Sequence, residues 1–237
     1  ARSLLLKLER RGSIILPARQ GAHYARRDCG LQAVLPLSAP IAEPLAGLLP
    51  LRVEALAARH PDTKVFASYL SQHHYLGYRG PVGENLAYLV RDRQGRDLAC
   101  VLFGAAAWKT APRDAWIGWD DKTRARRLSF VANNHRFLIL PWVQAPHLAS
   151  HILGRLARRL SGDWEEKYGH PVYLLETFVE RERFKGTCYR AANWTCVGQT
   201  KGRSRQDRYS TLRVPIKDIY LYPLTSSPRQ RLCHVEA

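Results

Sequence analysis

Residues 137–179 read FLILPWVQAPHLASHILGRLARRLSGDWEEKYGHPVYLLETFV. The apolar run Phe137–Leu140 predicts a buried strand. From about His147 to Tyr168 apolar residues recur at helical spacing, and Gly169 is a favourable position for the helix to end. Pro171–Val179 then predicts a second strand. Because two strands joined by a helix of this length pair in parallel, the segment predicts a mixed α/β fold.

The rest of the chain extends this unit on both sides. Upstream, two strands separated by residues 91–97, which contain Gly95, predict a hairpin. Strands and helices alternate irregularly along the sequence, which is typical of an α/β (α+β) domain with a mixed central sheet flanked by helices. The other expected elements are strands at Leu51–Leu56, Asn85–Val90, Leu98–Phe103, Thr195–Gly198 and Ile216–Tyr222, and helices at Asp62–His74, from Asp120 or Asp121 to about Phe130, and at Thr187–Ala192.

The chain divides into three parts by composition. Residues 1–27 contain seven basic residues and one acidic residue. Leucines at helical spacing, Gly12 and the strand-like Ser13–Leu16 follow one another as in the last half of a winged helix-turn-helix. The alternative is an amphipathic helix that caps the main domain. Residues 28–50, rich in Pro, Leu and Ala, predict a linker, and residues 51–237 the main domain.

Charge indicates the kind of partner. The chain has 37 Lys and Arg against 20 Asp and Glu, a formal net charge of +17. Such an imbalance costs stability through self-repulsion, which a polyanion relieves, and nucleic acid is the usual polyanion. Anionic membrane is the other candidate, but no uninterrupted apolar run approaches the roughly 20 residues of a spanning helix. We therefore expect DNA as a partner and no membrane.

Cysteine usage indicates the compartment. The five cysteines are scattered, with no CxxC pair and no disulfide framework, so a reducing cytoplasm is expected. The sequence contains no methionine, which is expected of a processed chain or of part of a longer one.

Two basic segments are the predicted nucleic-acid contacts. One is the short helix after Asp121, and the other is residues 181–208, where eight basic residues face two acidic ones and aromatic residues that can stack on bases are interleaved. The alternative is a solvated surface that charge keeps soluble. The side chains expected to contact phosphates are Lys122, Arg124, Arg126, Arg127, Lys185, Arg190, Lys201, Arg203 and Arg205.

The loop Gln144–Ala149 precedes the long helix, and a helix N-terminus after a strand can hold a pyrophosphate. The loop resembles the Gln/Arg-x-x-Gly-x-Gly/Ala pattern of acyl-CoA-binding loops in the N-acetyltransferase (GNAT) superfamily, as does the strand order. Gln144 and Ala149 match the pattern, and His147 stands where glycine allows close phosphate approach. The resemblance implies acetyl-CoA or a related acyl-CoA as cofactor, held by Gln144, His147 and Ala149. The departure at His147 puts that binding in doubt.

Three residues are candidates for catalysis. Glu176 lies on the apolar face of its predicted strand, where desolvation raises a carboxyl pKa toward that of a general base. The alternative is a buried salt bridge with a nearby Arg. Tyr189 lies where GNAT enzymes commonly carry the general acid, and His135, beside two asparagines, belongs to the same predicted cleft. His147 and His151 are one helical turn apart, but no third ligand has supporting spacing, so no metal site is predicted.

Four longer motifs resemble the DruA family, named for the Druantia anti-phage system. They are Tyr75–Tyr78, Val131–Trp142, His170–Phe178 and Gly186–Trp194. The resemblance covers about residues 50–222. In fuller members a winged-helix-like segment precedes this region, and related copies occur beside, or fused to, transposases.

The resemblance implies a DNA-associated protein of a mobile element or defence system, with transposase or defence proteins as partners. The alternative is an acyl-CoA-dependent N-acyltransferase that modifies nucleobases or amino groups. No metal-binding carboxylate triad supports a third possibility, a DNA-cutting enzyme.

Overall fold

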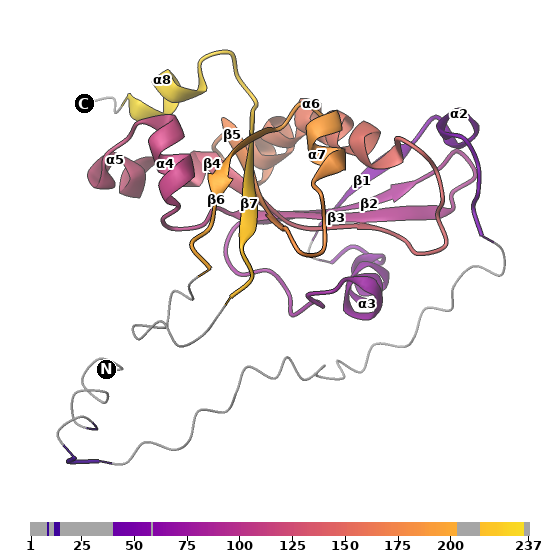
Figure 1. Cartoon of the computed structure of the whole chain (residues 1–237). Coiled ribbons are helices and arrows are strands. Elements are labelled where there is room, and N and C mark those ends of the chain that lie inside the picture. Colours follow the sequence, from indigo (N-terminus) through magenta and orange to yellow (C-terminus); the bar gives the residue numbers. More distant parts are fainter. Residues whose placement is uncertain (1–8, 10–11, 15–39, 58, 203–213, 235–237) are drawn as a thin grey trace. The chain divides into compact units, whose positions relative to one another are not determined.

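The computed structural model describes residues 9, 12–14, 40–57, 59–202 and 214–234 (Figure 1). The chain divides into two units, residues 1–30 and 31–237. In the first unit Gly12 has a left-handed backbone (φ 69°) and its N–H donates to the Glu9 carbonyl oxygen at 2.9 Å, a geometry that ends a helix. The remainder of the predicted winged-helix segment lies outside the described residues.

The second unit contains both helices and strands. In chain order they are α2 (Leu45–Leu48), β1 (Arg52–Leu56), α3 (Thr63–His73), β2 (Asn85–Arg91), β3 (Asp97–Ala105), α4 (Ala111–Ile117), α5 (Asp121–Arg127), the 3₁₀ turn η1 (Leu128–Phe130), β4 (Val131–Ile139), α6 (Leu148–Tyr168), β5 (Leu174–Glu180), α7 (Thr187–Ala191), β6 (Thr195–Gln199), β7 (Lys217–Pro223) and α8 (Pro228–Cys233).

The strands form one sheet in the order β1-β2-β3-β4-β5-β7-β6. Its only parallel pair among the described strands is β4 with β5, joined by α6 as predicted. The predicted hairpin between β2 and β3 is confirmed as an antiparallel pair. Asp92 shapes its turn, because its Oδ1 accepts from the N–H groups of Gln94 (2.8 Å) and Arg96 (2.9 Å). The predicted mixed α/β fold with a central sheet flanked by helices is therefore confirmed.

Strands β4 and β5 pair over a short stretch only. The paired residues are Val131–Asn133 with Leu174–Glu176, although β4 extends to Ile139 and β5 to Glu180. On its other side β4 follows β3 with a bulge, where His135 is the extra residue between the partners of Leu102 and Phe103. The parallel pair thus opens in the middle of the sheet.

Helices cover the sheet from both sides, with α6 on one face and α3 on the other (Figure 1). The apolar stripe of α6, formed by Leu148, Ile152, Leu156 and Leu160, is almost fully buried. Burying such a side chain contributes about 1.5–3 kcal/mol, so α6 is held mainly by its stripe. No helix in the described part of the chain is long and apolar enough to cross a bilayer.

The predicted linker at residues 28–50 is wrong for its second half. Ile41 bridges to Val143 in parallel, and its backbone N–H donates to the Trp142 carbonyl oxygen at 2.8 Å. Leu48 on α2 is completely buried. Apolar side chains among prolines here fill the core next to the loop before α6, so residues 40–50 belong to the domain.

Candidate functional site

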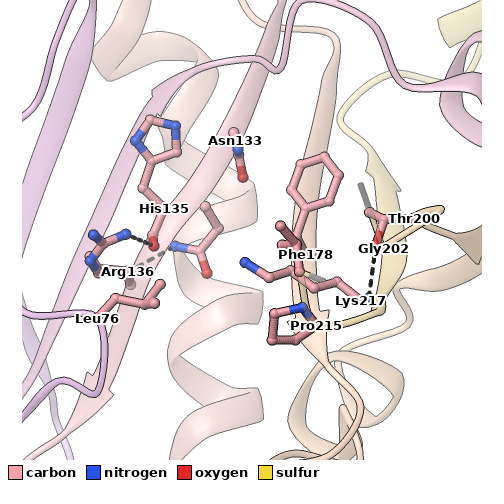
Figure 2. Close-up of a pocket in the computed structure, with 11 residues that line it drawn as sticks. Leu76, Asn133, His135, Arg136, Phe178, Thr200, Gly202, Pro215 and Lys217 are labelled. Carbon is pink, nitrogen blue, oxygen red and sulfur yellow. Dashed lines mark hydrogen bonds between the residues drawn. The ribbon is translucent and has the colours of Figure 1, made fainter. Parts of the chain in front are cut away.

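A pocket lies where the β4–β5 pairing stops, and we call it the β4–β5 pocket (Figure 2). Its volume is about 300 Å³. Side chains from β4 form one wall, and the segments on either side of residues 203–213 contribute the opposite wall. The lining residues are Leu76, Asn133, Asn134, His135, Arg136, Phe178, Thr200, Gly202, Val214, Pro215 and Lys217.

His135 is the titratable base in this pocket. Its Nε2 lies 3.1 Å from the Ala105 carbonyl oxygen, which can only accept, so Nε2 carries the proton and Nδ1 has the lone pair. Burial lowers the pKa of His135 below 6.5, against the opposing hydrogen bond to Ala105. The ring fits because residue 104 is glycine, since a Cβ there would lie 2.7 Å from the His135 Cε1 atom. His135 is therefore neutral at physiological pH.

Tyr189 lies beside the pocket rather than in its lining. Its hydroxyl donates to Asn134 Oδ1 at 2.7 Å, and Thr177 Oγ1 donates to the Asn134 carbonyl oxygen at 3.2 Å. These bonds link β4, β5 and α7 beyond the last backbone pair. Burial raises the pKa of Tyr189. The structure thus brings Tyr189 to the residue that precedes His135, as a buried hydrogen-bonded phenol.

Glu176 is completely buried and does not line the pocket. Its Oε2 accepts from Arg113 Nη1 at 2.9 Å, and its Oε1 accepts from the Ala107 N–H at 2.7 Å. Burial raises the pKa of Glu176, although Arg113, itself fully buried, opposes that shift. This geometry favours the alternative stated above, a buried salt bridge, over a general base.

The loop before α6 has a glycine-like backbone at the position that departs from the acyl-CoA pattern. His147 is left-handed (φ 65°) and exposed. The Gln144 N–H donates to the Ile41 carbonyl oxygen at 2.8 Å, so that amide is occupied. Amides of the first turn, Ala149 among them, have no acceptor within the helix. The loop therefore fits a pyrophosphate through the α6 first turn but not through the Gln144 amide.

The predicted nucleic-acid contacts have different environments. The prediction that Arg124 contacts phosphates does not fit the structure. Arg124 is 5% exposed, pairs with Asp121 at 2.6 Å and lies over the Trp108 ring, so it is held inside the domain. Arg127 is half-buried against Phe130. Arg203 and Arg205 lie outside the described residues. Of these predicted contacts, the exposed ones without an ion pair to a described carboxylate are Lys122, Arg126, Lys185, Arg190 and Lys201.

One trio of possible metal ligands, Glu54, His60 and Asp62, occurs among the described residues. Arg91 donates to Glu54 at 2.7 Å and to Asp62 at 2.6 Å. The guanidinium already pairs with both carboxylates, so an ion-pair network explains this cluster.

The opened parallel pair, the bulge in β4 and the loop at the start of α6 define a mixed α/β domain whose central sheet opens beside a helix N-terminus. The chain belongs to the DruA family, since the family model described as Druantia protein DruA matches residues 32–232. A search of curated proteins finds no match.

Solved structures with a similar arrangement include N-acetyltransferases. Spermidine/spermine N-acetyltransferase SpeG from Vibrio cholerae with manganese ions is 12% identical, with 76% of this chain and 96% of that chain covered and a TM-score of 0.47. The Vibrio cholerae spermidine N-acetyltransferase with CoA and spermine is 12% identical, with 73% and 95% covered and a TM-score of 0.48. The ribosomal L7/L12 alpha-N-protein acetyltransferase RimL is 11% identical, with 59% and 70% covered and a TM-score of 0.36.

Proposed function

We propose that this protein binds DNA as a component of an anti-phage defence system or mobile element in the bacterial cytoplasm. The observation that carries the proposal is the set of exposed cations that no described carboxylate neutralises. Membership of the DruA family is in keeping with a defence role, because such a system acts on phage DNA or on the host's response to it. Arginine and lysine contacts to phosphates would position the protein on the strand.

Besides the buried Arg124, five basic residues lie on α5 and α8, two helices that pack against each other at one end of the domain (Figure 1). We call this group the α5–α8 surface, formed by Lys122, Arg126, Arg127, Arg229 and Arg231. None of these five forms an ion pair with a described carboxylate. Arg229 lies over the Trp116 ring at 4.7 Å. Aromatic rings orient the guanidinium groups of Arg127, Arg229 and Arg231 without neutralising them, which leaves their charge available to a polyanion.

A salt titration of the full chain with duplex DNA tests the proposal. The logarithm of the binding constant should fall linearly with the logarithm of salt between about 50 and about 200 mM, with a slope near −0.9 for each neutralised phosphate. The double variant Lys122→Gln/Arg126→Gln should make that slope shallower by about 1–2.

The matched control is Arg52→Gln/Arg93→Gln, which removes the same charge from two exposed arginines on β1 and on the β2–β3 turn. We expect the control to leave the slope nearly unchanged. No binding by the unaltered chain to any DNA at low salt would overturn the proposed function.

Acyl transfer is the second candidate, and the neutral His135 in the β4–β5 pocket is the observation that favours it. An acyl-CoA, when bound, would supply an activated acyl thioester. The loop with Gln144, His147 and Ala149 would hold its pyrophosphate at the first turn of α6. His135 Nδ1 would accept the proton that an attacking amino group loses, because its lone pair is free and the ring is uncharged.

Thermal shift with acetyl-CoA separates the two candidates. A bound ligand at about 100 times its dissociation constant stabilises the folded chain by about 2.7 kcal/mol and so raises the Tm. Arg155→Gln on α6, outside the loop, serves as a charge control for His147→Glu, which should abolish the shift by repelling phosphate. No shift at millimolar acetyl-CoA would exclude the second candidate.

A further inference from the structure

A second pocket lies beside α5 and α8, outside the site described above. Its volume is about 540 Å³. We call it the α5–α8 pocket; it is lined by Arg127, Phe130, Tyr173, Ser226, Ser227, Gln230, Arg231 and His234. None of these residues is acidic, and two of them are arginines. A volume of this size is in the range of pockets that hold small molecules.

The two arginines are held in place by aromatic rings. Phe130 and Tyr173 stack on each other with their centroids 5.2 Å apart and their planes 7° apart. The Arg127 guanidinium carbon lies 4.1 Å from the Phe130 centroid, and that of Arg231 lies 5.3 Å from the Tyr173 centroid. Arg127 Nη2 also donates to the Arg231 carbonyl oxygen at 2.6 Å. These contacts fix the guanidinium groups while leaving most of their N–H donors unused.

Neither arginine forms an ion pair with a carboxylate in the described part of the chain. The other polar lining groups are hydroxyls, an amide and an imidazole, which add hydrogen-bond donors without adding negative charge. Two oriented guanidinium groups, two serine hydroxyls and no acid favour a tetrahedral oxyanion with several acceptor oxygens. Guanidinium groups bind phosphate in a bidentate manner, so a phosphate ester fits this donor set better than a carboxylate or a neutral ligand.

We propose that the α5–α8 pocket binds a phosphate group of a nucleotide. The inference deepens the proposed function and rests on it where the nucleotide belongs to a DNA strand. The ring faces are already covered by Arg127, Arg231 and each other, so the phosphate rather than the base is the group recognised. A strand on the α5–α8 surface would place one backbone phosphate in the pocket, and a free nucleotide would present the same group.

The test measures binding of the full chain to a fluorescent single strand of about 16 nucleotides and to the matching duplex. Arg127→Gln/Arg231→Gln should weaken binding about tenfold or more, because two charge-assisted contacts are lost. Gln230→Glu should weaken it by a similar factor, because it adds a negative charge to the pocket without removing the bond between Arg127 and the Arg231 carbonyl. Unchanged melting temperatures show that both variants are folded.

Arg52→Gln/Arg93→Gln is again the matched control, since it removes two exposed arginines that lie on β1 and on the β2–β3 turn, outside both the α5–α8 surface and the pocket lining. We expect at most about a twofold to threefold loss for this control. An equal loss in the control and the pocket pair would mean diffuse attraction, which overturns the pocket and leaves DNA binding intact.

Thermal shifts with free dAMP and with inorganic phosphate show whether the pocket binds a phosphate group that does not belong to a DNA strand. If the chain binds no DNA, the proposed function fails, and the pocket is then judged by dAMP alone. A rise in Tm with dAMP that disappears in Gln230→Glu would support the pocket. The absence of any dAMP-induced shift in a chain that binds no DNA would overturn it.

Discussion

Arginines at the β1–β3 edge of the sheet and arginines on the α5–α8 surface have opposite surroundings. Arg91 donates to Glu54, Asp62 and Asp97 at distances of 2.6–2.7 Å. Arg127 and Arg231 have no such partners among the described residues and lie over aromatic rings instead. Among the described arginines, Arg91 thus has its charge balanced by carboxylates, whereas the charges of Arg127 and Arg231 remain available to bind an anion.

The difference shows that net charge alone does not locate a binding surface. Basic residues that pair inside the domain hold the fold together, and only those that lack an acidic neighbour can attract a polyanion. Arg113 and Arg124 belong to the first kind, because both are buried in ion pairs. The predictions below separate the two kinds by measuring stability and binding together, from the largest expected effect to the smallest.

Glu176→Gln should have the largest effect on stability. It removes one of the two carboxylates that pair with buried Arg113 and leaves Asp114 as the remaining ion-pair partner. Breaking a buried pair costs about 3–5 kcal/mol of unfolding free energy, and because the Asp114 pair remains we expect a loss near about 3 kcal/mol. Urea denaturation measures this loss of unfolding free energy. Glu182→Gln is the control, because Glu182 is an exposed carboxylate two residues beyond β5. A change below about 1 kcal/mol would show that the ion pair does not hold α4 to the sheet.

Arg91→Gln and Arg231→Gln should have opposite patterns of effect on stability and on DNA affinity. Arg91→Gln leaves three carboxylates close together, and we expect a loss of about 2 kcal/mol in unfolding free energy with little change in DNA affinity. Arg231→Gln should cost less than about 1 kcal/mol in stability, since only a ring contact is lost, but should weaken DNA binding. Urea denaturation and fluorescence anisotropy on both variants give the comparison. Equal effects of both substitutions on binding would contradict the distinction.

Acid should destabilise the fold through His74, which feels the charge of Arg136. Arg136 donates to the carbonyl oxygens of Gly77 and His135. Burial, and then the Arg136 charge, lower the pKa of His74 to about 4. Below about pH 6.5 the unfolded chain binds a proton that the folded chain does not, so stability falls from there down to about pH 4.

His74→Asn tests this, because it keeps an acceptor for the Leu76 N–H and cannot titrate. Unfolding free energies at about pH 7.5 and about pH 5 should differ less in the variant than in the unaltered chain. Other histidines with lowered pKa, such as His135, keep part of the difference. An unchanged difference would mean that His74 is already solvated in the folded chain.

The smallest effect is expected for Arg181→Gln. Arg181 pairs with Asp218 at 3.3 Å, but its side chain is 51% exposed. Exposed pairs contribute about 0–1 kcal/mol, so urea denaturation should show a change of at most about 0.5 kcal/mol. A larger loss would place this pair with the neutralised structural arginines.

Most of the fold could be predicted from patterns of residues that are close in the sequence. The predicted strands and helices around residues 137–179 and the β2–β3 hairpin depend on spacing and turn residues close in sequence, so they were predictable. Helices α4 and α8 were missed because each is short and has a proline within its first two residues, so neither shows a clear helical periodicity. Residues 40–50 were misassigned because their partners lie near residue 142, about a hundred positions away.

The candidate sites depended more on distant contacts. The β4–β5 pocket contains the predicted His135, but Lys217 and Leu76 join it from other parts of the chain. The α5–α8 pocket was missed apart from Arg127. A weak signal was present in Arg229 and Arg231, two cations in a short C-terminal segment, but nothing nearby in sequence links them to Phe130 or Tyr173.

The sequence by itself determined a mixed α/β domain, an excess of positive charge and the motifs of the DruA family, because periodicity, composition and contiguous motifs are local properties of the chain. Only the tertiary structure decided which arginines are neutralised and which are not. In the described part of the chain arginines form ion pairs with residues up to 63 positions away, as Arg113 does with Glu176, and such partners are set by how strands and helices pack.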